Sequence, residues 1–203
     1  MIVAIDGPAG AGKSTVARLL AERLGFSYLD TGAMYRAVTW LALERAVDPD
    51  DESALGALAR EAPVGFDGAS VQIAGNDVTR DIRTPRVDAV VPTVARHPAV
   101  REIMRARQRE LAETTDAVVE GRDIGTVVAP QAEVKVFLVA DPSVRASRRI
   151  AERPDADPEE LRRRDERDAE RTLKADDAEL IDTTELTIDE VVAAIEELVR
   201  ARV

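Results

Sequence analysis

Hydrophobic and polar positions along this chain form two recurring patterns: short continuous apolar runs and longer segments with apolar residues at helical spacing. The first apolar run, Ile2–Ile5, is long enough for a buried strand, and the next segment carries Val16, Leu20 and Leu24 on one helical face. Repeated alternation of this kind predicts an α/β fold with a five-stranded parallel sheet and helices on both faces. The other four main strands are expected at residues 26–29, 117–119, 134–139 and 178–182.

Amphipathic segments predict the helices between these strands. The last helix is expected to begin at Thr187-Ile-Asp-Glu190, a sequence typical of a capping box. Its predicted buried face comprises Ile188, Val191, Val192, Ile195, Leu198 and Val199. Between the first and the last helix, further helices are expected at about 32–45, 50–62, 85–96 and 98–113, from 141 onward, and at about 158–171.

A small β element interrupts the alternation. Residues 64–66 and 70–74 flank Asp67-Gly68, which is typical of a hairpin turn, and Asn76-Asp77 predicts a further turn before a short strand at Val78. We interpret this region as a subdomain inserted within a single domain. The expected boundaries are 1–203 for the domain, 1–63 and 114–203 for its core, about 64–113 for the inserted subdomain and about 153–164 for a lid.

Composition narrows the class of protein. A chain of 203 residues with 45% hydrophobic residues can bury one good core. We find neither an apolar run of about 18 residues nor the pattern of a signal peptide, so no membrane span is expected. The absence of cysteine fits a cytoplasmic protein. The net charge of −11 argues against nucleic acid and anionic membranes as partners, and we expect a monomer.

The stretch Gly7–Ser14 fits the phosphate-binding pattern G-x-x-x-x-G-K-[ST]. It lies between a predicted strand and a predicted helix, where glycines let backbone N–H groups surround phosphate oxygens and the helix N-terminus adds partial positive charge. Lys13 is expected to reach the β- and γ-phosphates of ATP, and the Ser14 hydroxyl to ligate Mg²⁺. The expected ATP-binding residues are Gly7, Pro8, Ala9, Gly10, Ala11, Gly12, Lys13, Ser14 and Thr15.

Two further motifs follow predicted strands, at the edge of the sheet where ligands of open parallel sheets gather. Leu29–Arg36 offers Thr31 and Arg36 to a second ligand, and Glu120–Thr126 offers the Arg122 guanidinium and Asp123. The alternative interpretations are a solvated helix end for Arg36 and a loop ion pair between Arg122 and Asp123.

Arg164, Asp168 and Arg171 are spaced to share one face of the helix expected at about 158–171, so they could point together at a ligand. The alternative is a solvated face with pairs such as Glu160 and Arg164. A phosphate monoester is already largely a dianion at neutral pH, so its transfer to a second phosphate needs aligned cations rather than a general base.

Together these stretches resemble bacterial cytidylate kinases over almost the whole chain. The resemblance is carried by 7–15, 30–36, 81–84, 120–128, 164–168 and 181–184. It implies a single P-loop kinase domain in which the inserted subdomain at about 64–113 binds the nucleoside monophosphate. It also implies transfer of the ATP γ-phosphoryl group to CMP or dCMP with Mg²⁺, directly and without a covalent intermediate. It also implies catalytic roles for Lys13, Arg122, Arg164 and Arg171, and acceptor contacts from Thr31, Arg36, Arg101, Gly121, Arg122, Asp123, Arg164 and Asp168.

One position departs from the family pattern, because Pro92 stands where a serine that reads cytosine is expected. Base discrimination would then fall to Arg101, Asp123 or Thr93. One alternative is a related kinase that acts on UMP, AMP or a small metabolite. Another is a nucleotide-sensing regulator without turnover; a GTP-dependent switch is disfavoured because neither N-K-x-D nor D-x-x-G occurs.

Overall fold

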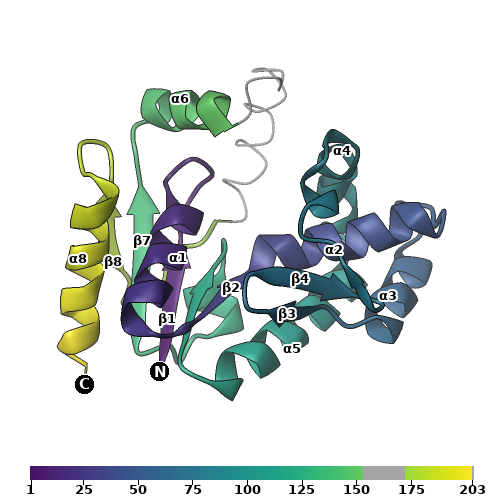
Figure 1. Ribbon diagram of the computed structural model, residues 1–203, viewed down its shortest axis with the longest axis horizontal. Helices are drawn as coiled ribbons and strands as arrows, with labels where there is room; N and C mark the ends of the chain where they lie inside the picture. The colour runs from purple at the N-terminus through teal and green to yellow at the C-terminus, as the bar shows by residue number, and fades with distance from the viewer. Residues whose placement is uncertain (153–171, 203) are drawn as a thin grey trace. The chain divides into compact units, whose positions relative to one another are not determined.

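The computed structural model describes residues 1–152 and 172–202 (Figure 1). The chain divides into two compact units. Met1–Leu29 and Ala112–Val203 form the first, which we call the sheet unit, and Asp30–Leu111 form the second, which we call the helical unit. The expected insertion at 64–113 covers only the later part of the helical unit.

The sheet unit is built on a five-stranded sheet in the order β2-β6-β1-β7-β8. Val3 of β1 pairs in parallel with Val118 of β6 on one side and with Val134 of β7 on the other. This sheet confirms the expected fold class. The strands are β1 (Ile2–Asp6), β2 (Ser27–Asp30), β6 (Ala117–Glu120), β7 (Val134–Val139) and β8 (Glu179–Asp182).

Two helices, α1 (Lys13–Leu24) and α8 (Ile188–Arg200), share a core with the sheet (Figure 1). Leu20 and Ile195 are fully buried there. Thr187 and Glu190 form the predicted capping box of α8. The prediction that Ile188 is buried is wrong, because it is the first residue of the helix and is 48% exposed. The unit also contains α6 (Pro142–Glu152) and a π-helix, η2 (Ile124–Val128).

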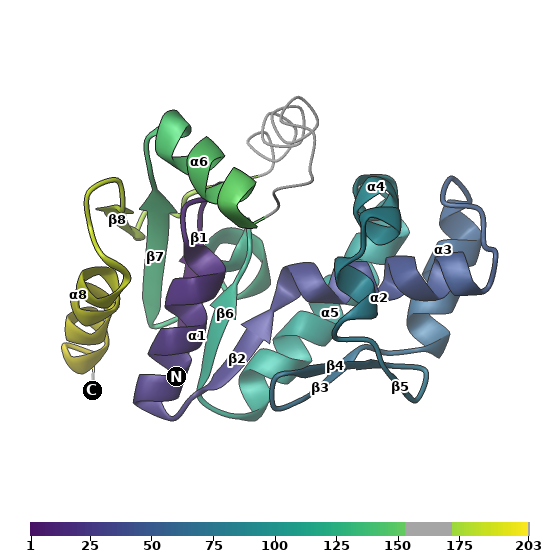
Figure 2. The same cartoon turned by 45° about the horizontal axis from the view of Figure 1, so that its top comes forward.

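The helical unit begins with α2 (Thr31–Glu44) and α3 (Glu52–Glu61) and ends in the longer α5 (Pro98–Thr114), which runs on past Leu111. The 3-10 turn η1 (Asp81–Arg83) leads into α4 (Pro85–Val94), whose interior contains Pro92. Between α3 and η1 lies an antiparallel sheet of β3 (Gly65–Asp67), β4 (Ser70–Ile73) and β5 (Asn76–Asp77) (Figure 2).

The second turn of this small sheet differs from the prediction. The chain turns at Ala74 and Gly75, both with positive φ, and Asn76-Asp77 is itself the third strand. Two consecutive left-handed residues are what a tight hairpin turn requires, and Ala74 adopts this conformation although alanine rarely does. In the part of the chain that the structure describes, we find no helix with the length and apolarity needed to span a membrane.

Candidate active site

The predicted phosphate loop follows β1 and leads into α1. Gly7 has a φ of +148°, and a Cβ there would lie 2.2 Å from the carbonyl oxygen of Leu138 in β7. Only glycine therefore allows the loop to start so close to the neighbouring strand. Lys13 opens α1, and its largely buried side chain folds back so that Nζ donates a 2.8 Å hydrogen bond to the carbonyl of Pro8. The ammonium group is thus held at the loop that is expected to bind phosphate.

Glu120 joins the phosphate loop to the strand beside it. The Ser14 hydroxyl donates a 2.9 Å hydrogen bond to Oε2 of Glu120, and the Tyr28 hydroxyl donates to Oε1. Glu120 ends β6, is only 4% exposed and pairs in register with Ile5 of β1. The sequence analysis gave Glu120 no role, because the pairing of β6 with β1 could not be read from the sequence.

The chemistry of this pair fits Mg²⁺, which prefers hard oxygen ligands and is usually held by one or two protein groups plus substrate phosphates and water. In the described part of the chain, no three His, Cys, Asp or Glu side chains gather where they could enclose a metal ion. Ser14 and Glu120 are described oxygen groups that fit one or two protein positions of such a site.

Asp6 fixes the segment that carries Arg122 and Asp123. Its carboxylate accepts hydrogen bonds of 2.8 Å from the backbone N–H groups of both Ile124 and Gly125, at the start of η2. Burial raises the pKa of Asp6 to about 6, although these two bonds act in the opposite direction. Arg122 Nη1 in turn donates a 3.2 Å hydrogen bond to the carbonyl of Gly7. The sequence analysis missed Asp6 because its partners lie more than a hundred residues away.

Two further arginines reach the phosphate loop from α6, which follows β7 (Figure 2). Arg145 Nη1 donates to the carbonyl of Ala9 at 3.2 Å, and Arg148 Nη1 donates to that of Gly10 at 3.5 Å. Arg148 also bonds through Nη2 to the carbonyl of Thr183 at 2.8 Å. Neither residue was predicted to belong to the site from the sequence.

In the helical unit, Arg36 is only 8% exposed, so the alternative of a solvated helix end is wrong. Its Nη1 donates a 2.9 Å hydrogen bond to the carbonyl of Ile82 and lies 2.5 Å from Oδ1 of Asp88. Thr31, also buried, is the first residue of α2, and Arg101 lies half-buried in the first turn of α5.

The structure thus groups the predicted site residues in two sets. The phosphate loop, Gly121, Arg122 and Asp123 belong to the sheet unit, and Thr31, Arg36 and Arg101 belong to the helical unit. The predicted lid at 153–164 and the residues Arg164, Asp168 and Arg171 lie outside the described residues, so their roles stay predictions.

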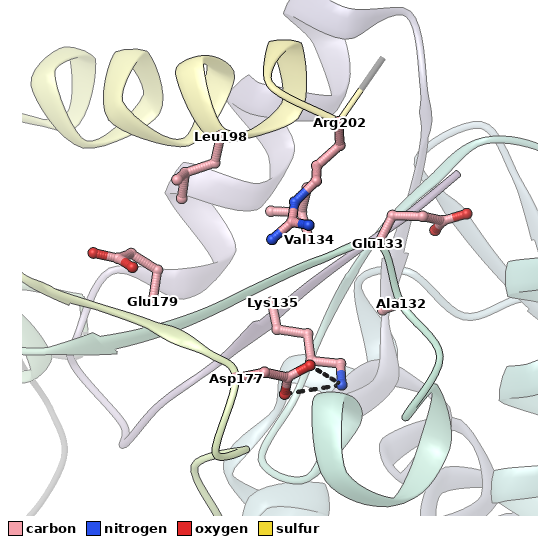
Figure 3. A pocket seen from close by; sticks show the side chains of 8 residues that line it. All are labelled: Ala132, Glu133, Val134, Lys135, Asp177, Glu179, Leu198 and Arg202. Atoms are coloured by element: carbon pink, nitrogen blue, oxygen red, sulfur yellow. Dashed lines mark hydrogen bonds and ion pairs between the residues drawn. The ribbon is translucent and has the colours of Figure 1, made fainter.

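A separate pocket of 280 Å³ opens where β7 and β8 begin, whereas the phosphate loop follows the end of β1 (Figure 3). Lys135 Nζ crosses part of it to bond both carboxylate oxygens of Asp177, at 2.8 and 3.0 Å. None of the predicted site residues lines this pocket.

The sheet and its phosphate loop define a P-loop nucleotide-binding protein with a kinase fold. A gluconokinase structure from Sinorhizobium meliloti shares this fold, with a TM-score of 0.51, 18% identity and coverage of 98% of this chain and 92% of that chain. Residues 3–201 match the cytidylate kinase family, and the chain belongs to that family.

Curated relatives are similar to this chain over nearly their full length. The chain is 49% identical to a cytidylate kinase of Bacillus licheniformis, with 98% of this chain and 96% of that protein covered. It is 50% identical to a cytidylate kinase of Geobacillus kaustophilus, with 99% and 97% covered.

Proposed function

We propose that this chain is an ATP-dependent kinase that transfers the γ-phosphoryl group of ATP to CMP, giving CDP and ADP. The observation that carries the proposal is the match to the cytidylate kinase family over residues 3–201. We also propose that dCMP is a second acceptor. We further propose that the protein is a monomer in the cytoplasm and acts without nucleic acid or membrane partners.

ATP binds at Gly7–Thr15, where backbone N–H groups of the loop and the N-terminus of α1 receive the phosphates. Lys13 exchanges its bond to the Pro8 carbonyl for the β- and γ-phosphate oxygens. When bound, Mg²⁺ would supply positive charge that stabilises the transferring phosphoryl group. Ser14 and Glu120 are the groups of this chain that would hold it, the first as a ligand and the second by accepting from Ser14 or from a bound water.

The acceptor is bound by Thr31, Arg36, Arg101, Gly121, Arg122, Asp123, Arg164 and Asp168. Its phosphate is already dianionic at neutral pH, so the attacking oxygen needs no base. The transfer is in line and direct. Lys13, Arg122, Arg164 and Arg171 neutralise the charge that develops on the transferred group.

The test is an ADP-release assay with ATP, Mg²⁺ and each of CMP, dCMP, UMP, AMP and GMP. We expect turnover with CMP and dCMP that exceeds turnover with the other acceptors. Faster turnover with UMP or AMP would assign a different acceptor. Tight ATP binding without turnover on any acceptor would instead support the nucleotide-sensing regulator.

A further inference from the structure

We propose that Asp88 is a positioning residue for the phosphoryl acceptor, because it holds the Arg36 guanidinium in the orientation that receives the acceptor's phosphate. This inference rests on the proposed function, in which Arg36 binds that phosphate. Asp88 belongs to none of the motifs through which the chain resembles its family, and it lies 52 residues from Arg36 in the sequence.

Arg36 is fixed by contacts from two other elements of the helical unit. Its Nη1 donates to the carbonyl of Ile82 in η1 at 2.9 Å and lies 2.5 Å from Oδ1 of Asp88 in α4. The side chains of Arg36 and Asp88 are only 9% and 13% exposed. Holding an arginine side chain in one conformation costs conformational entropy, because several of its bonds otherwise rotate freely. Because these contacts order it before the acceptor arrives, binding the acceptor does not have to meet that cost.

The contacts of Asp88 indicate that it orients Arg36 and does not itself bind the acceptor's phosphate. The contacts to Ile82 and Asp88 both use Nη1, and a guanidinium group binds phosphate as a fork through two parallel hydrogen bonds. A carboxylate cannot itself bind a dianionic phosphate, so Asp88 acts through Arg36. The negative charge of Asp88 repels the acceptor's phosphate. The gain in acceptor binding from orienting Arg36 must therefore exceed the loss from this repulsion.

Pro92 makes the ion pair more important to α4. It lies in the interior of the helix, four residues after Asp88, and has no N–H to donate to the Asp88 carbonyl. The turn that carries Asp88 is therefore held less firmly by helical hydrogen bonds than a regular turn. The ion pair with Arg36 attaches that turn to α2.

The same two helices supply a matched control. Glu44 of α2 pairs with Arg86 of α4 at 3.0 Å, and both side chains are exposed, at 46% and 62%. This pair also links α2 to α4, but it has no bond to Arg36. A substitution at Glu44 therefore reports the effect of loosening the two helices without reorienting Arg36.

The experiment measures kcat, the KM for CMP, the KM for ATP and the melting temperature of wild type, Asp88→Ala, Asp88→Asn and Glu44→Ala. We expect Asp88→Ala to raise the KM for CMP by about tenfold, while the KM for ATP stays within about twofold. Asp88→Asn keeps an oxygen acceptor but loses its charge, so its KM for CMP should rise by about threefold. Glu44→Ala should leave all three constants unchanged.

An unchanged KM for CMP in folded Asp88 variants would overturn the inference. A decreased KM would also overturn it, because competition by the carboxylate would then outweigh orientation. An equal rise in Glu44→Ala would assign the effect to helix packing. Should Asp88→Ala fail to fold, the sign of the change in Asp88→Asn decides. Wild type that phosphorylates no nucleoside monophosphate would refute the proposed function instead, and the two failures are therefore distinct.

Discussion

The Ser14 hydroxyl donates a 2.9 Å hydrogen bond to the carboxylate of Glu120, and this bond joins the first turn of α1 to the end of β6. The two residues are 106 positions apart in the sequence. Their proximity places a buried negative charge beside the hydroxyl that is expected to ligate Mg²⁺. Among the described residues, Glu120 is therefore a group that we expect to set the affinity for the metal.

Glu120→Gln tests that role. The glutamine can still accept from Ser14 through its amide oxygen, but the charge that attracts a cation is gone. We expect the Mg²⁺ concentration for half-maximal activity to rise by about tenfold and kcat to fall by about ten- to a hundredfold. Mg²⁺ titrations of initial rate at saturating ATP and CMP measure both values.

Tyr28→Phe is the matched control, because it removes the hydrogen bond from the Tyr28 hydroxyl to Glu120 and leaves the charge of Glu120 in place. It should alter the Mg²⁺ requirement far less than Glu120→Gln does. If both variants shift the Mg²⁺ titration equally, the orientation of Glu120 matters rather than its charge. A Glu120→Gln titration that matches wild type would remove Glu120 from the metal site.

Lys13→Ala should lower kcat by about a hundred- to a thousandfold, which is the typical loss when one group that stabilises transition-state charge is removed. The substitution removes the hydrogen bond from Nζ to the Pro8 carbonyl but leaves the backbone of the loop in place, and we expect the melting temperature to change little. Single-turnover rates and thermal unfolding measure the two effects. A small kinetic effect in a normally folded variant would exclude Lys13 from the catalytic role.

The phosphate loop was predictable because its pattern is local. Strand, glycines, Lys13 and Ser14 follow one another within a few residues, and their spacing alone specifies the turn. The strands β1, β6 and β7 were also predictable, since each is a compact, mainly apolar run. The capping box of α8 is similarly a signal of four adjacent residues.

The sequence did not predict which distant residues these local features contact. Asp6 reaches Gly125, and Arg36 reaches Asp88, only after separate elements have packed together. The π-helix at Ile124–Val128 was missed because its periodicity differs from the 3.6-residue repeat used to recognise α-helices. The exposure of Ile188 was missed because apolar spacing does not reveal where a helix leaves the core.

Asp6 predicts a specific pH dependence of stability. Its pKa rises from 3.8 to about 6 in the folded protein, because burial disfavours the charged carboxylate. The neighbouring Asp123 raises this pKa further, whereas Lys13 and the N–H groups of Ile124 and Gly125 lower it. Between pH 3.8 and about 6 the folded state therefore binds more protons at Asp6 than the unfolded state does. The contribution of Asp6 to the free energy of unfolding then falls as pH rises through this window, by up to about 3 kcal/mol.

The measurement compares the free energy of unfolding of wild type and Asp6→Asn between pH 4 and 7. Other titrating groups contribute equally to both proteins, so the difference between the two curves isolates Asp6. The advantage of wild type over Asp6→Asn should be larger at pH 4 than at pH 7. Parallel curves would show that the pKa of Asp6 is the same in the folded and unfolded states.

Alanine and serine at position 92 are expected to differ in their effects on stability and on base selection. A proline inside a helix costs about 3 kcal/mol, because it removes a hydrogen bond and crowds the carbonyl four residues before it. Pro92→Ala should therefore raise the melting temperature, as the restored N–H can donate to the Asp88 carbonyl. Pro92→Ser should give a smaller gain in stability, because serine is a weaker helix former than alanine.

Pro92→Ser also introduces the hydroxyl that the family pattern places at this position. We expect it to increase the ratio of kcat/KM for CMP to that for UMP, whereas Pro92→Ala, which adds no hydroxyl, leaves the ratio near that of wild type. One pair of titrations on each variant, with both pyrimidine monophosphates, measures this ratio. If alanine and serine change it equally, the helix geometry at Pro92 rather than a missing hydroxyl controls the choice of base. If neither changes it, base selection lies with Arg101, Asp123 or Thr93.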